Sequence, residues 1–178
     1  MTINPDSERR DAPAIRQCQP ADFADLLAII NDGASAYRGI IPADCCKEPY
    51  MPAAELEEEI AAGVVFWVCE EGGEPVAVMG LQDGADVTLI RHAYTRTSHQ
   101  GRGLGSALLT HLRAQTTRPI LIGTWKAATW AIRFYERHGF RVVSETEKRA
   151  LLQRYWTVPE RQIQESVVLA DARWAPAS

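Results

Sequence analysis

Residues 99–106 read His-Gln-Gly-Arg-Gly-Leu-Gly-Ser, and this glycine-rich stretch decides the fold prediction. It follows a β-rich run at 87–95 and precedes a helical pattern in which Leu104, Leu108 and Leu112 share one face. Glycine at alternate positions permits positive φ and lets a ligand touch the main chain. The helix that starts here points free N–H groups and the positive end of its dipole at the turn. We therefore expect this turn to bind a phosphate group.

Two other phosphate-binding motifs fit the spacing less well. A dinucleotide fingerprint would need glycine in place of Ser106 and should follow a first strand, not a third antiparallel one. A P-loop would need Gly-Lys followed by Ser or Thr, which this stretch lacks. A nucleotide-binding regulator is therefore the less favoured interpretation. A capping turn without a ligand stays open as an alternative.

Patterning on either side of the turn predicts the remaining elements. Before it we expect a strand at 14–18, a helix from Pro20 that stops at 31–33, an irregular loop at 34–52 and a helix at 52–62 with a solvated glutamate face. Three runs, 64–69, 75–81 and 87–95, predict an antiparallel meander. After the turn we expect a strand at 119–125, a helix ended by Gly139, a strand at 140–144, a helix at 145–157 and a strand at 165–169. This order predicts an α+β fold with a sheet of mixed direction.

Composition limits the class of protein. The 178 residues, 46% hydrophobic and 24% charged, predict one compact domain at 13–178 behind a flexible leader at 1–12. A net charge of −4 provides no field that would draw in nucleic acid or an anionic membrane. No apolar run is long enough to span a bilayer, and the leader lacks the apolar core of a signal peptide. Four cysteines without metal-ligand spacing favour reduced thiols, no metal and a cytoplasmic location.

A second motif lies about thirty residues after the turn. Residues 131–140 read Ala-Ile-Arg-Phe-Tyr-Glu-Arg-His-Gly-Phe, and residues 100–105 fit the pattern Q/R-x-x-G-x-G/A. In these two motifs, over about residues 13–170, the chain resembles the GNAT superfamily of acyl-CoA-dependent N-acetyltransferases. The resemblance implies a mixed, mostly antiparallel central sheet flanked by helices, with a V-shaped splay between the two central strands.

The resemblance also implies an acyl donor, acetyl-CoA, and the residues that hold it. The pyrophosphate would lie on the main-chain N–H groups of the turn, and the pantetheine arm in the splay. Main-chain groups of Tyr94 and Thr95 would face the pantetheine and the acetyl carbonyl, where an N–H can stabilise an oxyanion. The expected donor-binding residues are Tyr94, Thr95, Gln100, Gly101, Arg102, Gly103, Leu104, Gly105 and Ser106.

Tyr135 and His92 are the expected catalytic residues. The resemblance places Tyr135 as general acid to the departing thiolate; the alternative is a tyrosine with its ring in the core. The strand before the turn has no carboxylate after Asp86, so His92, whose imidazole can take a proton from the amine directly or through water, is the candidate general base. A structural His92 and a water relay stay open. Ala128 stands where the family often has an asparagine that contacts pantetheine.

The acceptor is expected to be a primary amine of a small molecule that attacks the thioester directly in a ternary complex. Its pocket is expected to be lined by Tyr37, Arg38, Trp67 and Trp125, and the arginine would suit a carboxylate-bearing amine. The alternative function is an acyl-CoA sensor or partner-binding domain that has lost transfer. Tyr155 and Trp156 are compatible with either a homodimer seam or a cap over the core.

Overall fold

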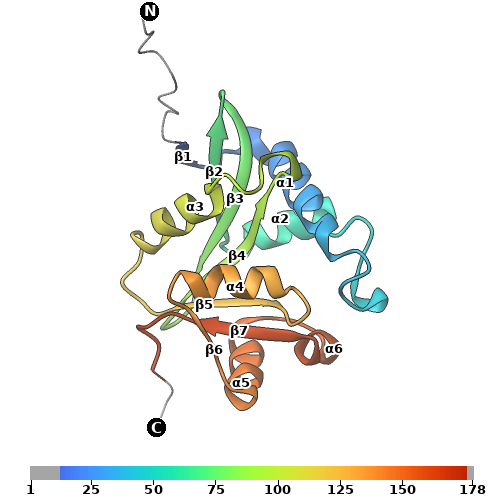
Figure 1. Ribbon diagram of the computed structural model, residues 1–178, viewed down its shortest axis with the longest axis vertical. Coiled ribbons are helices and arrows are strands. Elements are labelled where there is room, and N and C mark those ends of the chain that lie inside the picture. The colour runs from blue at the N-terminus through green and yellow to red at the C-terminus, as the bar shows by residue number, and fades with distance from the viewer. Residues whose placement is uncertain (1–12, 176–178) are drawn as a thin grey trace, which may run out of the picture.

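The computed structural model describes residues 13–175, so the expected leader at 1–12 lies outside the described residues. Figure 1 shows the elements in their order along the chain. The strands are β1 (Ala14–Gln17), β2 (Val65–Glu71), β3 (Glu74–Asp83), β4 (Thr88–Thr95), β5 (Ile120–Trp125), β6 (Arg141–Val142) and β7 (Ser166–Ala170). The helices are α1 (Phe23–Ala34), α2 (Ala53–Ala61), α3 (Leu104–Arg113), α4 (Thr129–Arg137), α5 (Glu145–Tyr155) and α6 (Glu160–Gln164). Within the described range no helix combines the length and apolarity needed to cross a membrane.

All seven strands form one sheet in the order β1-β2-β3-β4-β5-β7-β6. Strands β1 to β4 pair antiparallel, as do β5 with β7 and β6 with β7, whereas β4 and β5 are parallel. Successive hairpins explain the first half, and the helix α3 between β4 and β5 is the crossover that a parallel pair requires. The prediction of an α+β fold with a mixed, mostly antiparallel sheet is confirmed.

The two central strands separate partway along their length. Strand β4 pairs with β5 from Thr88 to Ile90, opposite Ile120 to Ile122, and the described ladder goes no further. Strand β5 continues from Gly123 to Trp125 paired with β7 alone. In Figure 1, β2 to β4 run steeply while β5 and β7 lie nearly horizontal, so the sheet opens between β4 and β5. The expected V-shaped splay is present.

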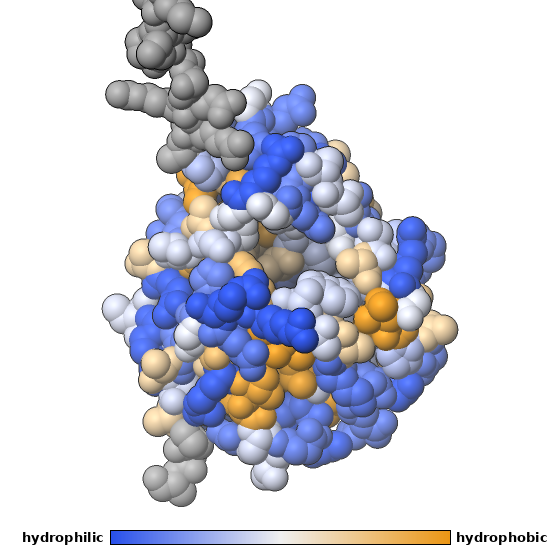
Figure 2. All heavy atoms as spheres, in the orientation of Figure 1, coloured by the Kyte–Doolittle hydropathy of each residue, from blue (hydrophilic) through white to orange (hydrophobic). Residues whose placement is uncertain are grey.

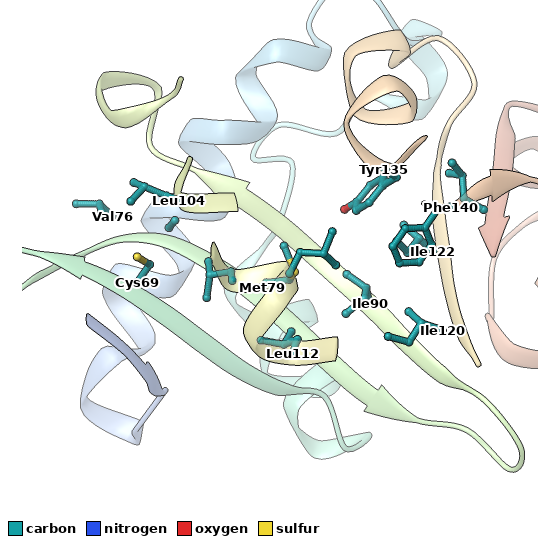
Figure 3. Packing of buried hydrophobic residues seen from close by; sticks show 14 residues of the cluster. Cys69, Val76, Met79, Ile90, Leu104, Leu112, Ile120, Ile122, Tyr135 and Phe140 are labelled. Carbon is teal, nitrogen blue, oxygen red and sulfur yellow. The ribbon is translucent and has the colours of Figure 1, made fainter. Parts of the chain in front are cut away.

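Each face of the sheet carries its own helices and its own core. On one face α3 and α4 cover a cluster that includes Met79, Ile90, Leu108 and Tyr135, part of which Figure 3 shows. On the other face α1 and α2 cover a cluster around Ile29, and α5 and α6 cover a cluster of β5 and β7 residues. Because side chains alternate along a strand, each central strand contributes side chains to the cores on both faces.

Three elements differ from the predictions. Helix α1 does not stop at 31–33 but runs to Ala34, and Asn31 within it accepts a hydrogen bond from the Met51 N–H at 2.8 Å. Gly33 also stays helical; a Cβ there would lie 3.0 Å from the Tyr94 side chain, so glycine lets α1 lie against β4. The strand at 140–144 is only the two residues of β6, and the short α6 is not predicted by any pattern used above.

Candidate active site

The glycine-rich turn exposes main-chain N–H groups at the start of α3. Gly101 and Gly103 have φ of 75° and 80°, values that favour glycine, and Gly103 precedes the first helical residue. Within residues 13–175 no side chain caps this helix end. A Cβ built on either glycine meets no atom within 4 Å, so the space above the turn is open. An anion can therefore approach the N–H groups and the positive end of the helix dipole.

Side chains of the turn are already engaged elsewhere. Arg102 donates to Glu71 Oε2 at 2.9 Å and to the Ser98 carbonyl, and Gln100 donates weakly to the Thr95 carbonyl at 3.4 Å. The Ser106 hydroxyl lies 3.0 Å from His138 Nε2, and the Leu104 side chain is buried in the core. The groups that remain for a ligand are mainly those of the main chain.

The register of β4 separates Tyr94 from Thr95. The Arg96 N–H donates to the Val76 carbonyl at 2.8 Å. In an antiparallel ladder, pairs with and without main-chain hydrogen bonds alternate, so the next hydrogen-bonded pair is Tyr94 with Val78. The main-chain groups of Tyr94 are thus used by β3, whereas those of Thr95 point away from β3, and the Thr95 carbonyl accepts from Gln100. This corrects the expectation for Tyr94, which offers its side chain on the α1 face instead. Thr95 stays a predicted donor-binding residue.

A β-bulge in β4 turns two consecutive side chains to one face. The β3–β4 register shifts between Val78 and Gly80, and His92 has φ of 49°, a left-handed value that is unusual for a residue with a side chain. Arg91 and His92 consequently both point toward α2, while Ala93 returns to the α3 face. Left-handed backbone at a non-glycine residue costs about 1–3 kcal/mol and occurs preferentially at functional sites.

Glu59 of α2 meets both of these side chains. Arg91 Nη2 donates to Glu59 Oε1 at 2.7 Å, and His92 Nε2 lies 3.5 Å from Glu59 Oε2. All three side chains are at least four-fifths buried, with exposures of 16% for Arg91, 15% for His92 and 19% for Glu59. Burial acts to raise the pKa of the Glu59 carboxyl, but His92 and Arg91 outweigh it and the pKa is lowered. Glu59 is therefore an anion at neutral pH.

Tyr135 reaches the splay from α4. It is 5% exposed, and in Figure 3 its hydroxyl points away from Phe140. A small recess of about 60 Å³ lies in the splay, lined by Tyr135, His92 and Thr124 among others. Figure 2 shows the surface hollowed beside α4. Burial raises the pKa of the Tyr135 phenol, so it holds its proton at neutral pH.

A larger groove of about 820 Å³ opens on the α2 face and also contains His92. Tyr37 and Trp125 line it, as expected, together with Tyr50. Trp125 Nε1 donates to Tyr50 Oη at 2.9 Å, and the rings of Tyr37 and Tyr50 lie 5.2 Å apart. The groove thus joins an aromatic wall to the imidazole of His92.

Two residues expected in the acceptor pocket lie elsewhere. Trp67 points to the opposite face of the sheet, where its ring lies 4.6 Å from that of His111 on α3. Arg38 is 63% exposed, ion-paired with Glu48 at 3.0 Å, and does not line the groove. Both expectations are corrected. Alternation along β2 decides the side of Trp67, because Phe66 takes the α1 face.

Two further features bear on the sequence predictions. Trp156 lies against β5, 3.4 Å from where a Cβ of Gly123 would stand, a contact that fits the interpretation as a cap over the core. Ala128 is fully buried at the start of α4, and Trp130, two residues on, stacks on Tyr37 with centroids 6.0 Å apart.

Sequence reasoning missed Glu59 and Tyr50. Glu59 was expected on a solvated glutamate face, yet it lies three residues after the buried Leu56 and so shares the inward side of α2. That spacing was a usable signal. Tyr50 lies in the irregular loop and bonds to Trp125, 75 residues away, and nothing local indicates that contact.

Comparisons with known proteins agree with this geometry. A family model described as an acetyltransferase (GNAT) domain matches residues 62–142, which run from the end of α2 to β6. Similar solved structures include a GNAT-family acetyltransferase from Staphylococcus aureus Mu50, at 17% identity and a TM-score of 0.67 over 90% of this chain and 98% of that one.

Two more solved structures share the fold. One is the PaiA N-acetyltransferase from Thermoplasma acidophilum in complex with coenzyme A, at 14% identity and a TM-score of 0.68 over 90% of this chain and 98% of that one. The other is the ribosomal-protein-S18-alanine N-acetyltransferase from Escherichia coli, at 14% identity and a TM-score of 0.65 over 93% and 97% of the two chains. At these identities the likeness concerns the fold.

Proposed function

We propose that the chain is a member of the GNAT superfamily and that it acetylates a primary amine of a small molecule with acetyl-CoA as donor. The family match over residues 62–142 and the shared fold support this proposal. The observation that carries the proposal is the splay between β4 and β5. It joins an open glycine turn on one face to an aromatic groove on the other, with Tyr135 and His92 lining the recess between them.

The turn and the splay fit an acetyl-CoA molecule. The uncapped N–H groups at the start of α3, held by Gly101 and Gly103, suit its pyrophosphate. The Thr95 N–H points away from β3 and suits a polar group of the pantetheine arm. In the Thermoplasma acidophilum structure with the same fold, coenzyme A is bound. Acetyl-CoA supplies an activated acyl group, whose thioester bond breaks as the amide bond forms.

Two residues that line the recess, His92 and Tyr135, each carry out one of the two proton transfers. The imidazole of His92 takes the proton that the attacking amine must lose, directly or through water. Tyr135, protonated at neutral pH, gives its proton to the departing sulfur. The Thr95 N–H stabilises negative charge on the carbonyl oxygen. Protons balance, because the amine loses one to His92 and the sulfur gains one from Tyr135.

The groove favours a small amine acceptor. Its volume of about 820 Å³ is in the usual range for small-molecule sites. Arg91 is ion-paired with Glu59, and Arg38 does not line the groove, so neither is placed to bind a substrate carboxylate. We therefore propose an acceptor that needs no carboxylate, in place of the carboxylate-bearing amine expected earlier.

The alternative, a sensor that binds acyl-CoA without transfer, drew on the missing strand carboxylate and on Ala128. Helix α2 places the Glu59 carboxylate beside His92, which favours the enzyme over the sensor. The continuous sheet over residues 13–175 supports the prediction of one domain at 13–178. A cytoplasmic location is proposed from the sequence, whose four cysteines lack metal-ligand spacing.

Two measurements test the proposed function together. Isothermal titration with acetyl-CoA should show binding, and a panel of small amines should include one that makes the protein release free thiol continuously from acetyl-CoA. Absence of binding at millimolar acetyl-CoA contradicts the proposal. Binding without amine-dependent thiol release favours the sensor.

A further inference from the structure

We propose that Glu59 is a positioning residue for His92, holding the imidazole by Nε2 so that Nδ1 accepts the proton of the amine. The inference rests on the proposed function for the role of His92, and it adds a residue from α2 to the catalytic machinery. It predicts a carboxylate and imidazole pair assembled from a helix and a bulged strand.

The first step of the argument is the state of Nε2. This nitrogen is buried and has no hydrogen-bond partner among the residues that the structure describes. An unpaired buried polar atom costs about 1–3 kcal/mol, so a partner is expected. Glu59 Oε2, at 3.5 Å, is the carboxylate oxygen that faces it. Catalytic hydrogen bonds are often long without substrate and shorten in the reacting complex.

The second step is that Glu59 itself is held in place. Arg91 Nη2 binds Oε1 at 2.7 Å and leaves Oε2 toward His92. Arg91 Nη1 donates to Gln82 Oε1 at 2.8 Å, and Gln82 donates to the Ala62 carbonyl at the end of α2. This chain of contacts links α2 to the bulge, so the carboxylate position is fixed from both sides.

The third step is the backbone. The left-handed φ of 49° at His92 is what directs Arg91 and His92 to the same carboxylate. Gly80 opposite the bulge allows it, because a Cβ there would lie 3.0 Å from the Arg91 carbonyl. A strained backbone that joins two side chains to one buried acid is typical of a functional constraint.

The groups that face the imidazole determine how it titrates. They are the carboxylate of Glu59 on α2, the guanidinium of Arg91 on β4 and the ring of Phe66 on β2, with the phenols of Tyr37, Tyr94 and Tyr135 lining the same recess and Glu55 and Glu58 of α2 lining the same groove. The Glu59 carboxylate is the anion within ion-pair distance of the ring, so replacing Glu59 with glutamine removes the charge that stabilises the imidazolium.

The test follows His92 by NMR in the full chain, without turnover. The sequence has four histidines, and the signal lost in His92→Gln identifies the one of interest. In Glu59→Gln the titration midpoint of His92 should fall by about one pH unit, whereas Glu57→Gln, an exposed change on the same helix, should leave it in place. An unmoved midpoint in a folded Glu59→Gln protein overturns the proposal.

A kinetic cycle supplies the second test. Glu59→Gln should lower kcat/KM roughly tenfold and move the acid limb of its pH profile to lower pH. If Glu59 acts through His92, Glu59→Gln added to His92→Gln should change kcat/KM by less than about twofold. If the losses in kcat/KM of the two single variants multiply in the double variant, the proposal is overturned. If Glu59→Gln does not fold, the same kinetic cycle is measured with Glu59→Asp, which keeps the carboxylate charge.

The two tests separate this inference from the proposed function. Wild-type protein that releases no thiol with any amine contradicts the function, while the NMR result still decides the pairing. Wild-type protein that turns over, with an unmoved midpoint, contradicts the pairing and leaves the function standing.

Discussion

The candidate sites on the two faces of the sheet are built from different kinds of atoms. On the α3 face the candidate donor site is built mainly of main-chain N–H groups around Gly101 and Gly103, and its side chains are engaged elsewhere. On the α2 face the candidate acceptor site is built of side chains, among them Glu59, His92 and Trp125. A main-chain site tolerates many side chains but few changes at glycine, whereas a side-chain site depends on each contact.

The largest effect is expected at Gly103. In Gly103→Val a β-branched residue must take a φ of 80°, and its side chain enters the open space over the turn. We expect acetyl-CoA affinity to fall at least about tenfold by isothermal titration. Gly63→Val, at φ of 95° beside α2, imposes the same strain on the other face and should leave the affinity unchanged. Equal losses in both variants would show that the donor site is not local to the turn.

Tyr135→Phe tests the point where the two faces meet. It removes one phenol from the recess, so kcat should fall about 100-fold while acetyl-CoA affinity stays nearly constant. The deficit should shrink with an acetyl thioester of an aromatic thiol, because a more acidic thiol leaves without needing a proton. A deficit that is the same for both donors would remove Tyr135 from proton transfer.

Trp125→Phe tests the acceptor face against its opposite. Losing the indole N–H breaks the 2.9 Å bond to Tyr50, and we expect KM for the amine to rise roughly fivefold with little change for acetyl-CoA. Trp67→Phe is the matched control, because its Nε1 is buried without a partner among the described residues and it lies on the α3 face. A rise in amine KM for Trp67→Phe would reverse the assignment of the two tryptophans.

Asp22→Asn should affect stability and leave turnover unchanged. Hydrogen bonds from Arg16 and the Gln19 N–H lower the pKa of the Asp22 carboxyl to about 2. Since the folded value is below the ordinary 3.8, this stabilisation is present above about pH 4 and is lost as pH falls to about 2. We expect thermal or urea unfolding near pH 7 to show a loss of about 2 kcal/mol that disappears toward pH 2. A change in kcat would contradict the purely structural role of the Asp22–Arg16 pair.

The α3 face could be predicted from the sequence because its determinants are local. The glycines, the start of α3 and Tyr135 lie within two short motifs, and the helices α3 and α4 of this face followed from their periodicity. The α2 face depends on contacts between distant residues: Glu59 with Arg91 across 32 positions and Tyr50 with Trp125 across 75. Alternation along β2 gave the side of Trp67 only once the face of Phe66 was known.

The most direct test of the central claim is a crystal structure with an inert bisubstrate analogue that joins coenzyme A to an amine. We predict the pyrophosphate at the start of α3, the pantetheine between β4 and β5, the sulfur beside Tyr135, and the amine portion in the groove next to His92. An analogue whose amine portion lies on the α3 face, or whose pantetheine lies outside the splay, would contradict the account.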